Sequence, residues 1–472
     1  MSDQTTPSAV AARARKPRGV AVAGLAASMF LVVLGVAMVN LAGPAIRTGL
    51  GLSAAELTMV ASGYLVALAG PLLLGGRLAD VLGGRKVFLA GMAVYLAASV
   101  ACALALSGPV LIAARVAQGI GASLLMPSSL VLLLALYETA AERTRAMGMW
   151  GTITGAGSLL GVFLGGTLTE LLGWESVFWA PVPFGIVSAI AVWRSVPAFP
   201  GRPGPFDVAG AVTITVGVSG LALGMVLAPE TGWSAPGTLI ALVVGVASFA
   251  AFVVAERRCA HPLVPLTVLR RQPVVTAAAV MLLLGATLMS LLFFLPLYQQ
   301  EVLGMSALAT GMGQLPIAAM IIVGSATAPL LATQIGPARA LPAGLVPLLA
   351  GLLWLVLNPA TDGFSAHLLG AFLLIGTGLG LSTTNAVTMA VRDSGEGESG
   401  LISGLISTGQ QLGGAVGLAA LAGLAIGAAG ANGDISFTTA FLAQTTLILT
   451  ALALSLIPPA RPKPAPATAG PR

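Results

Sequence analysis

The chain has 472 residues, of which 57% are hydrophobic and only 8% are Asp, Glu, Lys or Arg. Soluble domains carry roughly 25% charged residues, so this composition excludes a water-soluble globular protein and predicts a membrane protein. The net charge of +6 and the pI of about 9.9 arise from basic residues in many separate connections, which argues against a nucleic-acid-binding patch gathered on one face.

Fourteen segments free of Asp, Glu, Lys and Arg follow one another along the chain. Each holds the ~20 apolar residues that cross a hydrocarbon core, where only a helix satisfies its own backbone hydrogen bonds. We therefore predict an all-α polytopic membrane protein with fourteen transmembrane helices. The predicted spans are 19–46, 57–76, 87–114, 116–137, 146–169, 176–193, 208–229, 231–255, 272–300, 302–338, 340–361, 363–391, 399–433 and 435–460.

The longest internal connections, at about 195–207 and 256–273, bracket spans seven and eight. This pair is typical of an insertion between two blocks of six helices. The predicted units are a disordered cytoplasmic N-terminal tail (1–18), a six-helix bundle (19–194), two inserted helices with their linkers (195–273), a second six-helix bundle (274–458) and a disordered cytoplasmic C-terminal tail (459–472).

An internal repeat supports the division into six, two and six helices. Spans five and thirteen, each the fifth of its block, carry three glycines at four-residue spacing: Gly157, Gly161 and Gly165, and Gly409, Gly413 and Gly417. Repeated halves are typical of secondary transporters that rock around a midplane site. Such glycines either pack two helices tightly or form a sliding surface, and both interpretations remain open.

Basic residues predict the orientation. With the N-terminus inside the cell, 20 of the 22 Lys and Arg residues fall in cytoplasmic segments, while Arg47 lies outside and Arg115 lies within a span. By the positive-inside rule and the even number of spans, both termini are predicted to be cytoplasmic. The external connections carry the acids Glu56, Glu170, Glu175, Glu230, Glu301, Asp362 and Asp434. We expect Glu56 and Glu301 to be solvated loop charges.

Residues 75–86, GGRLADVLGGRK, concentrate four charges and four glycines in an otherwise apolar chain. We predict a short cytoplasmic turn between spans two and three, where charge is hydrated and glycine allows a tight reversal. Asp80 would lie near a helix C-terminus, where an acid opposes the macrodipole. We therefore expect a cationic partner for Asp80, either Arg85 or an arginine of a neighbouring helix.

Arg115 is the basic residue inside a predicted span. Placing Arg in a bilayer costs roughly 2.5–3.5 kcal/mol on insertion scales, so it is a functional candidate. The alternative is snorkelling, because Arg115 lies about two turns from the outer end of its helix. Gln118 shares its face, Asn40 reaches midplane depth, and no Asp or Glu lies well inside a span. We predict a polar coupling network of Arg115, Gln118 and Asn40.

Soft and aromatic side chains of spans nine and ten predict an adaptable apolar cavity, although lipid-facing side chains are the alternative. The candidate cavity residues are Met289, Phe293, Phe294, Met312 and the glutamine of the Gly313–Gln314 pair. The chain lacks a phosphate-binding GxxxxGK[ST] loop, an HExxH motif, a CxxC pair and a nucleophile elbow. We therefore predict no catalytic residues, no metal site and no ATP hydrolysis.

Several motifs resemble those of the major facilitator superfamily, specifically its fourteen-span drug:proton antiporter branch. The resemblance covers residues 19–458 and is carried by GRLADVLGGRK at 76–86, ARVAQGIGA at 114–122 and GSLLGVFLGG at 157–166. GWESVFWAPVPFG at 173–185, GW at 232–233 and QLGGAVG at 411–417 also lie where this branch has them.

The resemblance implies roles for three groups of residues. Gly76, Asp80, Gly83, Arg85 and Lys86 match the loop that latches the two halves in one access state. Arg115 matches the span-four arginine of the proton-linked network. The span-five antiport motif corresponds to Gly157, Gly161, Gly165 and Gly166.

Two positions depart from the family pattern. Gly35 stands where span one of the family has an aspartate, and Val162 replaces the proline of the span-five motif. The first change removes a residue that the family is thought to use in proton coupling, and the second removes a proline that favours a kink. Proton antiport is therefore implied by the resemblance, and these two positions argue against it.

The resemblance implies an exporter of amphiphilic drugs or antibiotics in the bacterial inner membrane, not an enzyme, working by alternating access. It would use the proton gradient and no cofactor. Its partners would be a small amphiphilic substrate and the lipid bilayer, with no nucleic acid and no obligate protein partner. Gly35 favours an alternative, a facilitator or importer of a small metabolite without proton antiport. A non-transporting sensor or scaffold is the other alternative.

Overall fold

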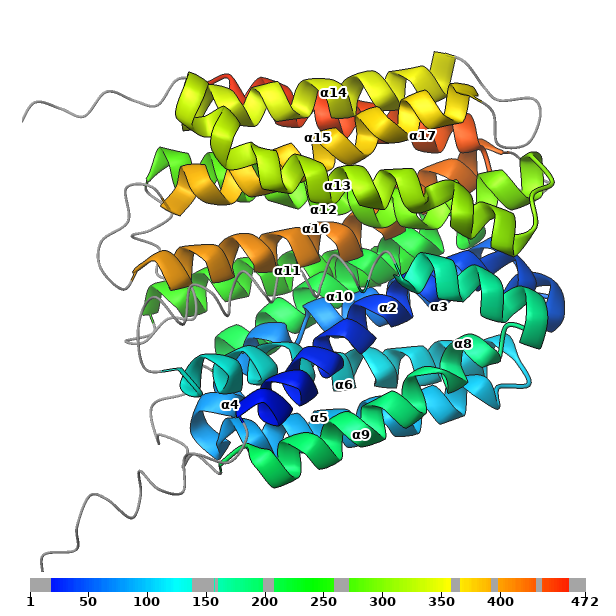
Figure 1. Ribbon diagram of the computed structural model, residues 1–472. Coiled ribbons are helices and arrows are strands. Elements are labelled where there is room, and N and C mark those ends of the chain that lie inside the picture. The colour runs from blue at the N-terminus through cyan, green and yellow to red at the C-terminus, as the bar shows by residue number, and fades with distance from the viewer. Residues whose placement is uncertain are drawn as a thin grey trace, which may run out of the picture.

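The computed structural model describes residues 18–137, 157, 160–197, 208–258, 271–357, 366–391, 398–429 and 435–457. In these ranges all regular secondary structure is helical, and the helices lie side by side in one bundle (Figure 1). Eleven of the described helices are long and apolar enough to cross a membrane, and three shorter apolar helices complete the fourteen predicted spans. The predicted all-α fold is confirmed. The predicted disordered tails and most of both long linkers lie outside the described residues.

The first block begins with a long helix and ends with a broken one. Its helices are α2 (Arg18–Leu50), α3 (Ala54–Ala69), α4 (Leu72–Leu82), α5 (Gly84–Ala103), α6 (Gly108–Ala135), the helix Leu160–Leu172, α8 (Ser176–Trp179) and α9 (Pro181–Ser195). A capping box between Ser53 and Glu56 begins α3, so Glu56 caps a helix. The second predicted span is divided between α3 and α4, because Pro71 has no N–H to continue the ladder.

The second part of the chain contains the inserted pair and the second block. Its helices are α10 (Val208–Thr231), α11 (Pro236–Arg258), α12 (Gln272–Leu297), the π-helix η2 (Tyr298–Val302), α13 (Ala307–Ile335), α14 (Pro337–Leu357), α15 (Ala366–Val391), α16 (Glu398–Ala428) and α17 (Phe437–Ser455).

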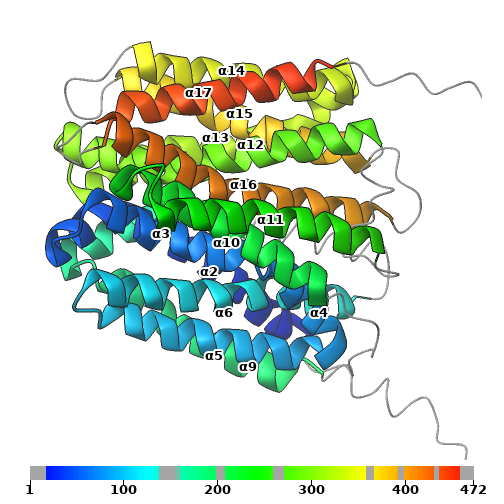
Figure 2. The same ribbon diagram turned by 180° about the vertical axis from the view of Figure 1, so that it is seen from behind.

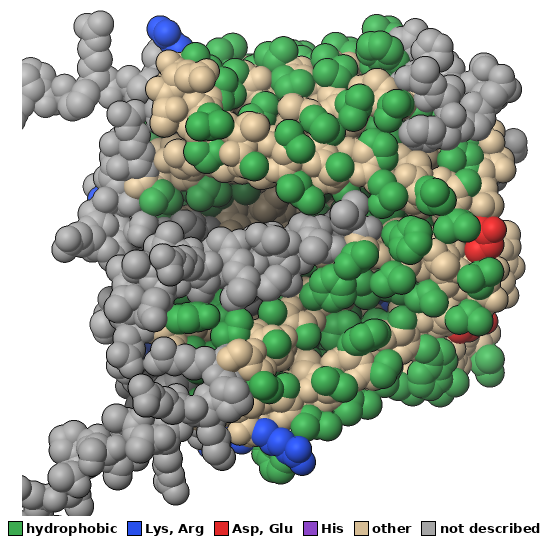
Figure 3. All heavy atoms as spheres, viewed as in Figure 1, with side chains coloured by type: hydrophobic (Ala, Val, Ile, Leu, Met, Phe, Trp, Pro, Cys, Tyr) green, Lys and Arg blue, Asp and Glu red, His purple; other side chains and the backbone are tan. Residues whose placement is uncertain are grey.

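The bundle has two ends of opposite charge. Because successive spans alternate in direction, Arg85, Arg194, Arg257, Arg258 and Arg339 lie at one end, which we call the basic end. Glu56, Glu170, Glu175 and Glu301 lie at the other, which we call the acidic end. Figure 3 shows blue side chains toward the left, red ones at the right edge and hydrophobic side chains between them. The start of α2 and the end of α17 both lie at the basic end (Figure 1).

The two blocks use the same helix pairings. In the first block Gly161 packs on α2, and a methyl group there would lie 2.8 Å from Ala37 Cβ. In the second block Gly413 packs on the backbone of Leu282 in α12. Gly119 brings α6 onto α3, as Gly376 brings α15 onto α13. Both pairings recur at equivalent places, as expected of two structural repeats.

The pair α10–α11, which the sequence predicts to be an insertion, contacts both six-helix blocks, and we call these blocks the two halves. The two helices cross closely where Gly220 meets Gly245. On the first half, Gly70 at the end of α3 contacts Thr215 of α10. On the second half, Ala222 of α10 packs with Ala419 of α16. The pair therefore contacts both halves on one face of the bundle, the face seen in Figure 2.

Candidate functional site

The two halves are joined at the acidic end by polar contacts. Arg47, near the end of α2, forms an ion pair with Glu301 of η2 at 3.0 Å between Nη1 and Oε1. Next to this pair, the Gln300 side-chain amide donates to the Leu41 carbonyl at 3.0 Å. Glu301 is solvent-exposed, as expected from the sequence, but it lies in the helix η2 and is paired with Arg47, which the sequence did not predict.

In a third contact, a side chain of the first half caps the N-terminus of a helix of the second half. Glu170 accepts a hydrogen bond from the Leu308 N–H at 2.9 Å, in the first turn of α13. This N–H and the Ser306 hydroxyl hold the pKa of the Glu170 carboxyl below its ordinary value. A carboxylate at a helix N-terminus also complements the helix dipole. We call the Arg47–Glu301, Gln300–Leu41 and Glu170–Leu308 contacts the acidic-end clamp.

Close backbone packing surrounds the acidic-end clamp. A methyl group at Gly311 of α13 would lie 2.8 Å from the Val162 carbonyl oxygen of the first half. Gly166, in the span-five motif, lies against the backbone of Ala307 and Leu308. Ala54 and Ala55 of α3 cluster with Ile426 of α16 across the same boundary. The described parts of the two halves are thus closed together at the acidic end.

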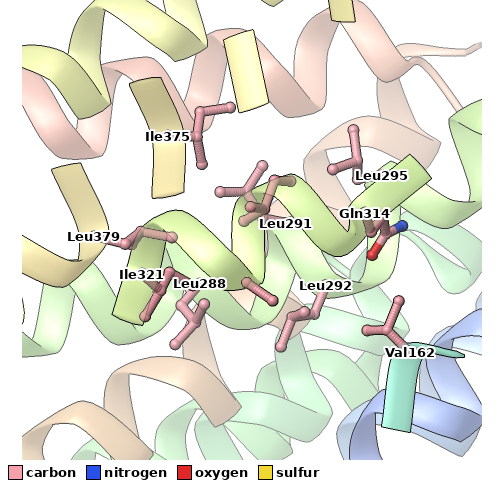
Figure 4. A pocket seen from close by; sticks show the side chains of 11 residues that line it. Val162, Leu288, Leu291, Leu292, Leu295, Gln314, Ile321, Ile375 and Leu379 are labelled. Atoms are coloured by element: carbon pink, nitrogen blue, oxygen red, sulfur yellow. The ribbon is translucent and has the colours of Figure 1, made fainter. Parts of the chain in front are cut away.

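A cavity lies beneath this closure, between the second half and Val162 of the first (Figure 4). It is partly open, and the ≈ 460 Å³ of space between its walls includes open solvent. Its walls are aliphatic except for Gln314. The lining residues are Val162; Leu288, Leu291, Leu292 and Leu295 of α12; Gln314, Ile317, Ala318 and Ile321 of α13; and Ile375 and Leu379 of α15.

Gln314 is the polar group of the cavity wall. It is 4% exposed, and its Nε2 donates to the Oε1 of the fully buried Gln299 at 3.0 Å. Gln299 belongs to η2, next to the two residues that reach across to α2. The cavity wall and the acidic-end clamp are thus joined by one hydrogen bond.

Four other predicted cavity residues do not line this cavity. On α12 the lining residues 288, 291, 292 and 295 share one helix face, and Met289 and Phe293 lie on another. Met289 packs on Gly414 of α16, and Phe293 is buried in edge-to-face contact with Phe294 at 5.2 Å. Met312 is 55% exposed on the outside of α13. Helix periodicity, more than residue softness, separates lining from non-lining positions.

Arg115 and Gln118 lie together in the interior of the first half. Arg115 Nη1 donates to Gln118 Oε1 at 2.6 Å, and Gln118 Nε2 donates to the Ser99 hydroxyl at 2.6 Å. Arg115 Nε donates to the Val60 carbonyl at 3.2 Å, and its guanidinium lies 4.2 Å from the centre of the Tyr64 ring. The side chain is 2% exposed, so it does not snorkel to the surface.

The sequence analysis singles out two positions of span one, Asn40 as a member of this network and Gly35 in place of the family aspartate. Gly35 faces Tyr95, whose hydroxyl would lie 2.8 Å from a methyl group placed on that glycine. The Tyr95 hydroxyl instead donates to the Leu31 carbonyl at 3.2 Å. Asn40 is buried in α2, and no hydrogen bond within the described ranges joins it to Arg115 or Gln118.

The predicted loop at 75–86 is a corner between two helices. Gly76 and Asp80 belong to α4, which extends to Leu82, and the reversal is made at Gly83, where φ is +95°. Arg85, in the first turn of α5, donates to the Trp193 and Val196 carbonyls at the end of α9. Lys86 is exposed. Arg85 therefore caps α9, and the Asp80 side chain lies outside what the structure describes.

Sequence reasoning missed the residues of the acidic-end clamp. Gln299 and Gln300 carry no motif, and no spacing relates Glu301 to Arg47 or Glu170 to Leu308. The one available signal is that Arg47 stands alone among acids in the external connections.

Comparison with known proteins places the chain among transporters. The profile of the Major Facilitator Superfamily matches residues 25–211 and 208–418. The chain is 35% identical to the cephamycin export protein CmcT of Amycolatopsis lactamdurans over 410 residues, 86% of this chain and 84% of that protein. It is 31% identical to the tetracenomycin C resistance and export protein of Streptomyces glaucescens, over 84% of this chain and 74% of that protein.

Two further comparisons also find a resistance protein and a transporter. The chain is 33% identical to the puromycin resistance protein of Streptomyces alboniger, over 86% of this chain and 81% of that protein. Among solved structures, the fold is similar to that of the transporter PepTSo of the POT family, with a TM-score of 0.69 and 15% sequence identity. That match covers 93% of this chain and 97% of the transporter.

Proposed function

The chain belongs to the major facilitator superfamily, and from that premise we propose that it exports an antibiotic or another amphiphilic drug across the bacterial inner membrane. The observation that carries the proposal is the aliphatic cavity beneath the closed acidic end. An apolar site with one polar group is suited to binding a hydrophobic substrate that carries a hydrogen-bonding group. Relatives at 31–35% identity are named for drug resistance or export, which supports the same substrate class.

Transport by alternating access follows from the two halves. With both termini in the cytoplasm, the acidic end faces outward, as the distribution of basic residues supports. The cavity would then be closed to the outside, and export would require the acidic-end clamp to open. The glycine-lined contact of Gly157, Gly161 and Gly165 with α2 provides packing surfaces near this opening.

Coupling to the proton gradient is the further part of the proposal. Arg115 and Gln118 supply a buried polar network, and the corner containing Gly76, Asp80, Gly83, Arg85 and Lys86 would stabilise one access state. Gly35, in place of the family aspartate, favours the second candidate function, a facilitator or importer without proton antiport. Collapsing the proton gradient in everted vesicles separates the two, because antiport stops and facilitated diffusion continues.

The export proposal is tested in a host that lacks its own pumps. Expression of the chain is expected to lower intracellular accumulation of an exported antibiotic and to raise its inhibitory concentration. The test uses a panel that includes puromycin, tetracenomycin C and a cephamycin. Arg115→Ala at equal membrane abundance is expected to lose the effect. Accumulation unchanged for every compound would contradict export, and full activity of Arg115→Ala would contradict its role.

A further inference from the structure

Three consecutive residues of η2 contact three different parts of the molecule. Gln299 bonds Gln314 in the cavity wall, Gln300 bonds the Leu41 carbonyl of α2, and Glu301 pairs with Arg47. We propose that the Gln299–Gln314 hydrogen bond couples the cavity wall to the acidic-end clamp, so that a change at the Gln314 amide alters closure of the acidic end. The inference deepens the proposed function, since it says how the cavity would reach the outer gate.

The local sequence leaves η2 with fewer backbone hydrogen bonds than a regular helix. Pro296 lacks an N–H, so the last turn of α12 loses one ladder bond before η2 begins. The chain then widens to a π-turn, in which the Leu303 N–H donates to the Tyr298 carbonyl at 3.2 Å. Single π-turns within helices are frequent at functional sites. A wide turn next to a missing ladder bond shifts with fewer broken bonds than a regular helix.

The anchors of η2 divide between the two halves. Tyr298 packs edge-on against Phe437 and Phe441 of α17, with ring centres 5.6 and 5.7 Å apart. Tyr298 and Gln299 thus hold η2 to its own half, and Gln300 and Glu301 hold it to α2. Of these four contacts, only the Gln299 contact leads to the cavity, because Gln314 lines it.

The Gln299–Gln314 bond is sensitive to the cavity because both amides are buried. An amide without a partner is costly in an apolar wall, so each side chain holds the other in place. If Gln314 turns toward a hydrogen-bonding group in the cavity, Gln299 Oε1 loses its donor, and of its bonds only the contacts with Met305 hold Gln299 to its own half. The positions of Gln300 and Glu301 then relax, and the bonds across to α2 weaken.

The test measures closure of the acidic end without any drug. Spin labels are attached at Leu106→Cys and Gly427→Cys, in a background with Cys102→Ala and Cys259→Ala. Leu106 is 93% exposed in the first half, and Gly427 has open space around it in the second, so neither label touches the acidic-end clamp. The distance between the labels reports whether the halves separate at this end, and export activity is measured separately.

Gln299→Met and Gln314→Met are each expected to raise the open-to-closed ratio about 2- to 10-fold, the effect of one neutral hydrogen bond. The double variant is expected to do no more than Gln299→Met, because both single variants remove the Gln299–Gln314 bond and Gln299→Met also removes the contact of Gln299 Nε2 with Met305 Sδ. Arg47→Met, which breaks the acidic-end clamp directly, is the positive control. The matched control is Gln444→Met in α17, a buried glutamine whose amide has no hydrogen-bond partner among the described residues, and it is expected to leave the distances unchanged.

Wild-type distances in Gln314→Met, with Arg47→Met shifted, would overturn the coupling, as would additive shifts in the double variant. Wild-type distances in Arg47→Met would overturn the acidic-end clamp itself. If the methionine variant fails to fold, Gln314→Asn keeps an amide that is one methylene too short to reach Gln299, and the same shift is expected. Failure of export with these shifts intact would contradict the proposed function and leave the coupling standing.

Discussion

Arg115 is a buried cation held by neutral groups. Its hydrogen bonds go to the Val60 carbonyl and the Gln118 amide, and its guanidinium stacks on Tyr64. Within the described ranges, no carboxylate lies within ion-pair distance of it. A buried charge is stable only when its donors are satisfied. The neutral partners therefore have to compensate the desolvation cost of the Arg115 guanidinium without the help of a carboxylate.

Replacing Gln118 tests this dependence. Gln118→Leu removes the acceptor of Arg115 Nη1 and the donor to Ser99. A buried hydrogen bond to a charged group contributes about 1.5–3 kcal/mol, so the midpoint of thermal unfolding of the purified protein is expected to fall clearly. Gln444→Leu removes an amide without a hydrogen-bond partner in the described part of the chain, so its midpoint is expected to stay at or above that of the wild type. Equal midpoints in the two variants would contradict a structural role for the Gln118 bonds.

At this scale the sequence predicts only what one helix brings together. Arg115 and Gln118 lie three residues apart, so their contact follows from helix geometry. Tyr64 and Val60 come from α3 and Ser99 from α5, and their approach depends on how three helices pack. For the same reason, the sequence identifies the glutamine of the cavity and not the Gln299 side chain that holds it.

The acidic-end clamp places a carboxylate of one half on a helix of the other. The Leu308 N–H and the Ser306 hydroxyl lower the pKa of Glu170 from its ordinary value of 4.5. A carboxylate whose pKa is lowered in the closed state stabilises that state above its ordinary pKa. That stabilisation is lost as the pH falls through the lowered value.

The contribution of Glu170 to the stability of the closed state is therefore expected to be constant between about pH 5.5 and pH 8, where the carboxylate stays ionised. Glu170→Gln should raise the open-to-closed ratio by the same factor at every pH in this interval. The distance between labels at positions 106 and 427 measures the ratio. A wild-type ratio that changes across the interval, and a Glu170→Gln variant in which the change is absent, would make Glu170 a titrating gate and contradict this expectation.

Glycines of α16 offer a test of helix packing with an internal control. Gly413 lies directly on the backbone of Leu282, and Gly409 has only the Ala278 carbonyl oxygen at 3.6 Å. Gly413→Ala is expected to destabilise the protein by about 1–3 kcal/mol, the usual cost of overpacking. Gly409→Ala is expected to be neutral or stabilising, because alanine is the better helix former. Unfolding by denaturant gives both values, and equal stabilities of the two variants would contradict the close contact at Gly413.

At the scale of elements, the sequence predicts the helices whose positions are determined by hydropathy alone. All fourteen predicted spans correspond to helices, because a charge-free run of this length has no other stable form in lipid. The break between α3 and α4 at Pro71 and the π-turn after Pro296 were not predicted, since proline ends, kinks or widens a helix depending on its neighbours. The charged stretch after Gly75 continues as helix to Leu82, and Gly75 packs on the Ser123 backbone of α6.

For the whole molecule, the acidic-end clamp would bias the equilibrium between the closed and open states of the proposed transport cycle. The Arg47 and Glu301 side chains are 25% and 28% exposed, so their ion pair contributes at most about 1 kcal/mol. Several such weak contacts together keep the halves closed and still allow them to separate. A transporter needs both states within a few kcal/mol, and a small set of exposed polar bonds fits that requirement.

A charge exchange tests this bias. Arg47→Glu is expected to raise the open-to-closed ratio, because the new carboxylate would face that of Glu301 at the position of the ion pair. Arg47→Glu combined with Glu301→Arg is expected to return the ratio toward the wild-type value, with a total effect of up to about 5-fold. The label distance and the rate of drug export are measured on the same variants. A double variant that stays as open as Arg47→Glu would show that the pair does not hold the halves together.

The pair α10–α11 would resist a movement of the two halves against each other. α10 contacts α3 through Gly70 and Thr215, and α16 through Ala222 and Ala419, so it touches both halves at once. When the halves change their angle, α10 must slide along at least one of these helices. Larger side chains, Met59 and Val66 of α3 and Met225 of α10, pack against the same alanines, so sliding would also have to move them. The packing of two helices that do not line the cavity at Gln314 would thereby help to set the rate of transport.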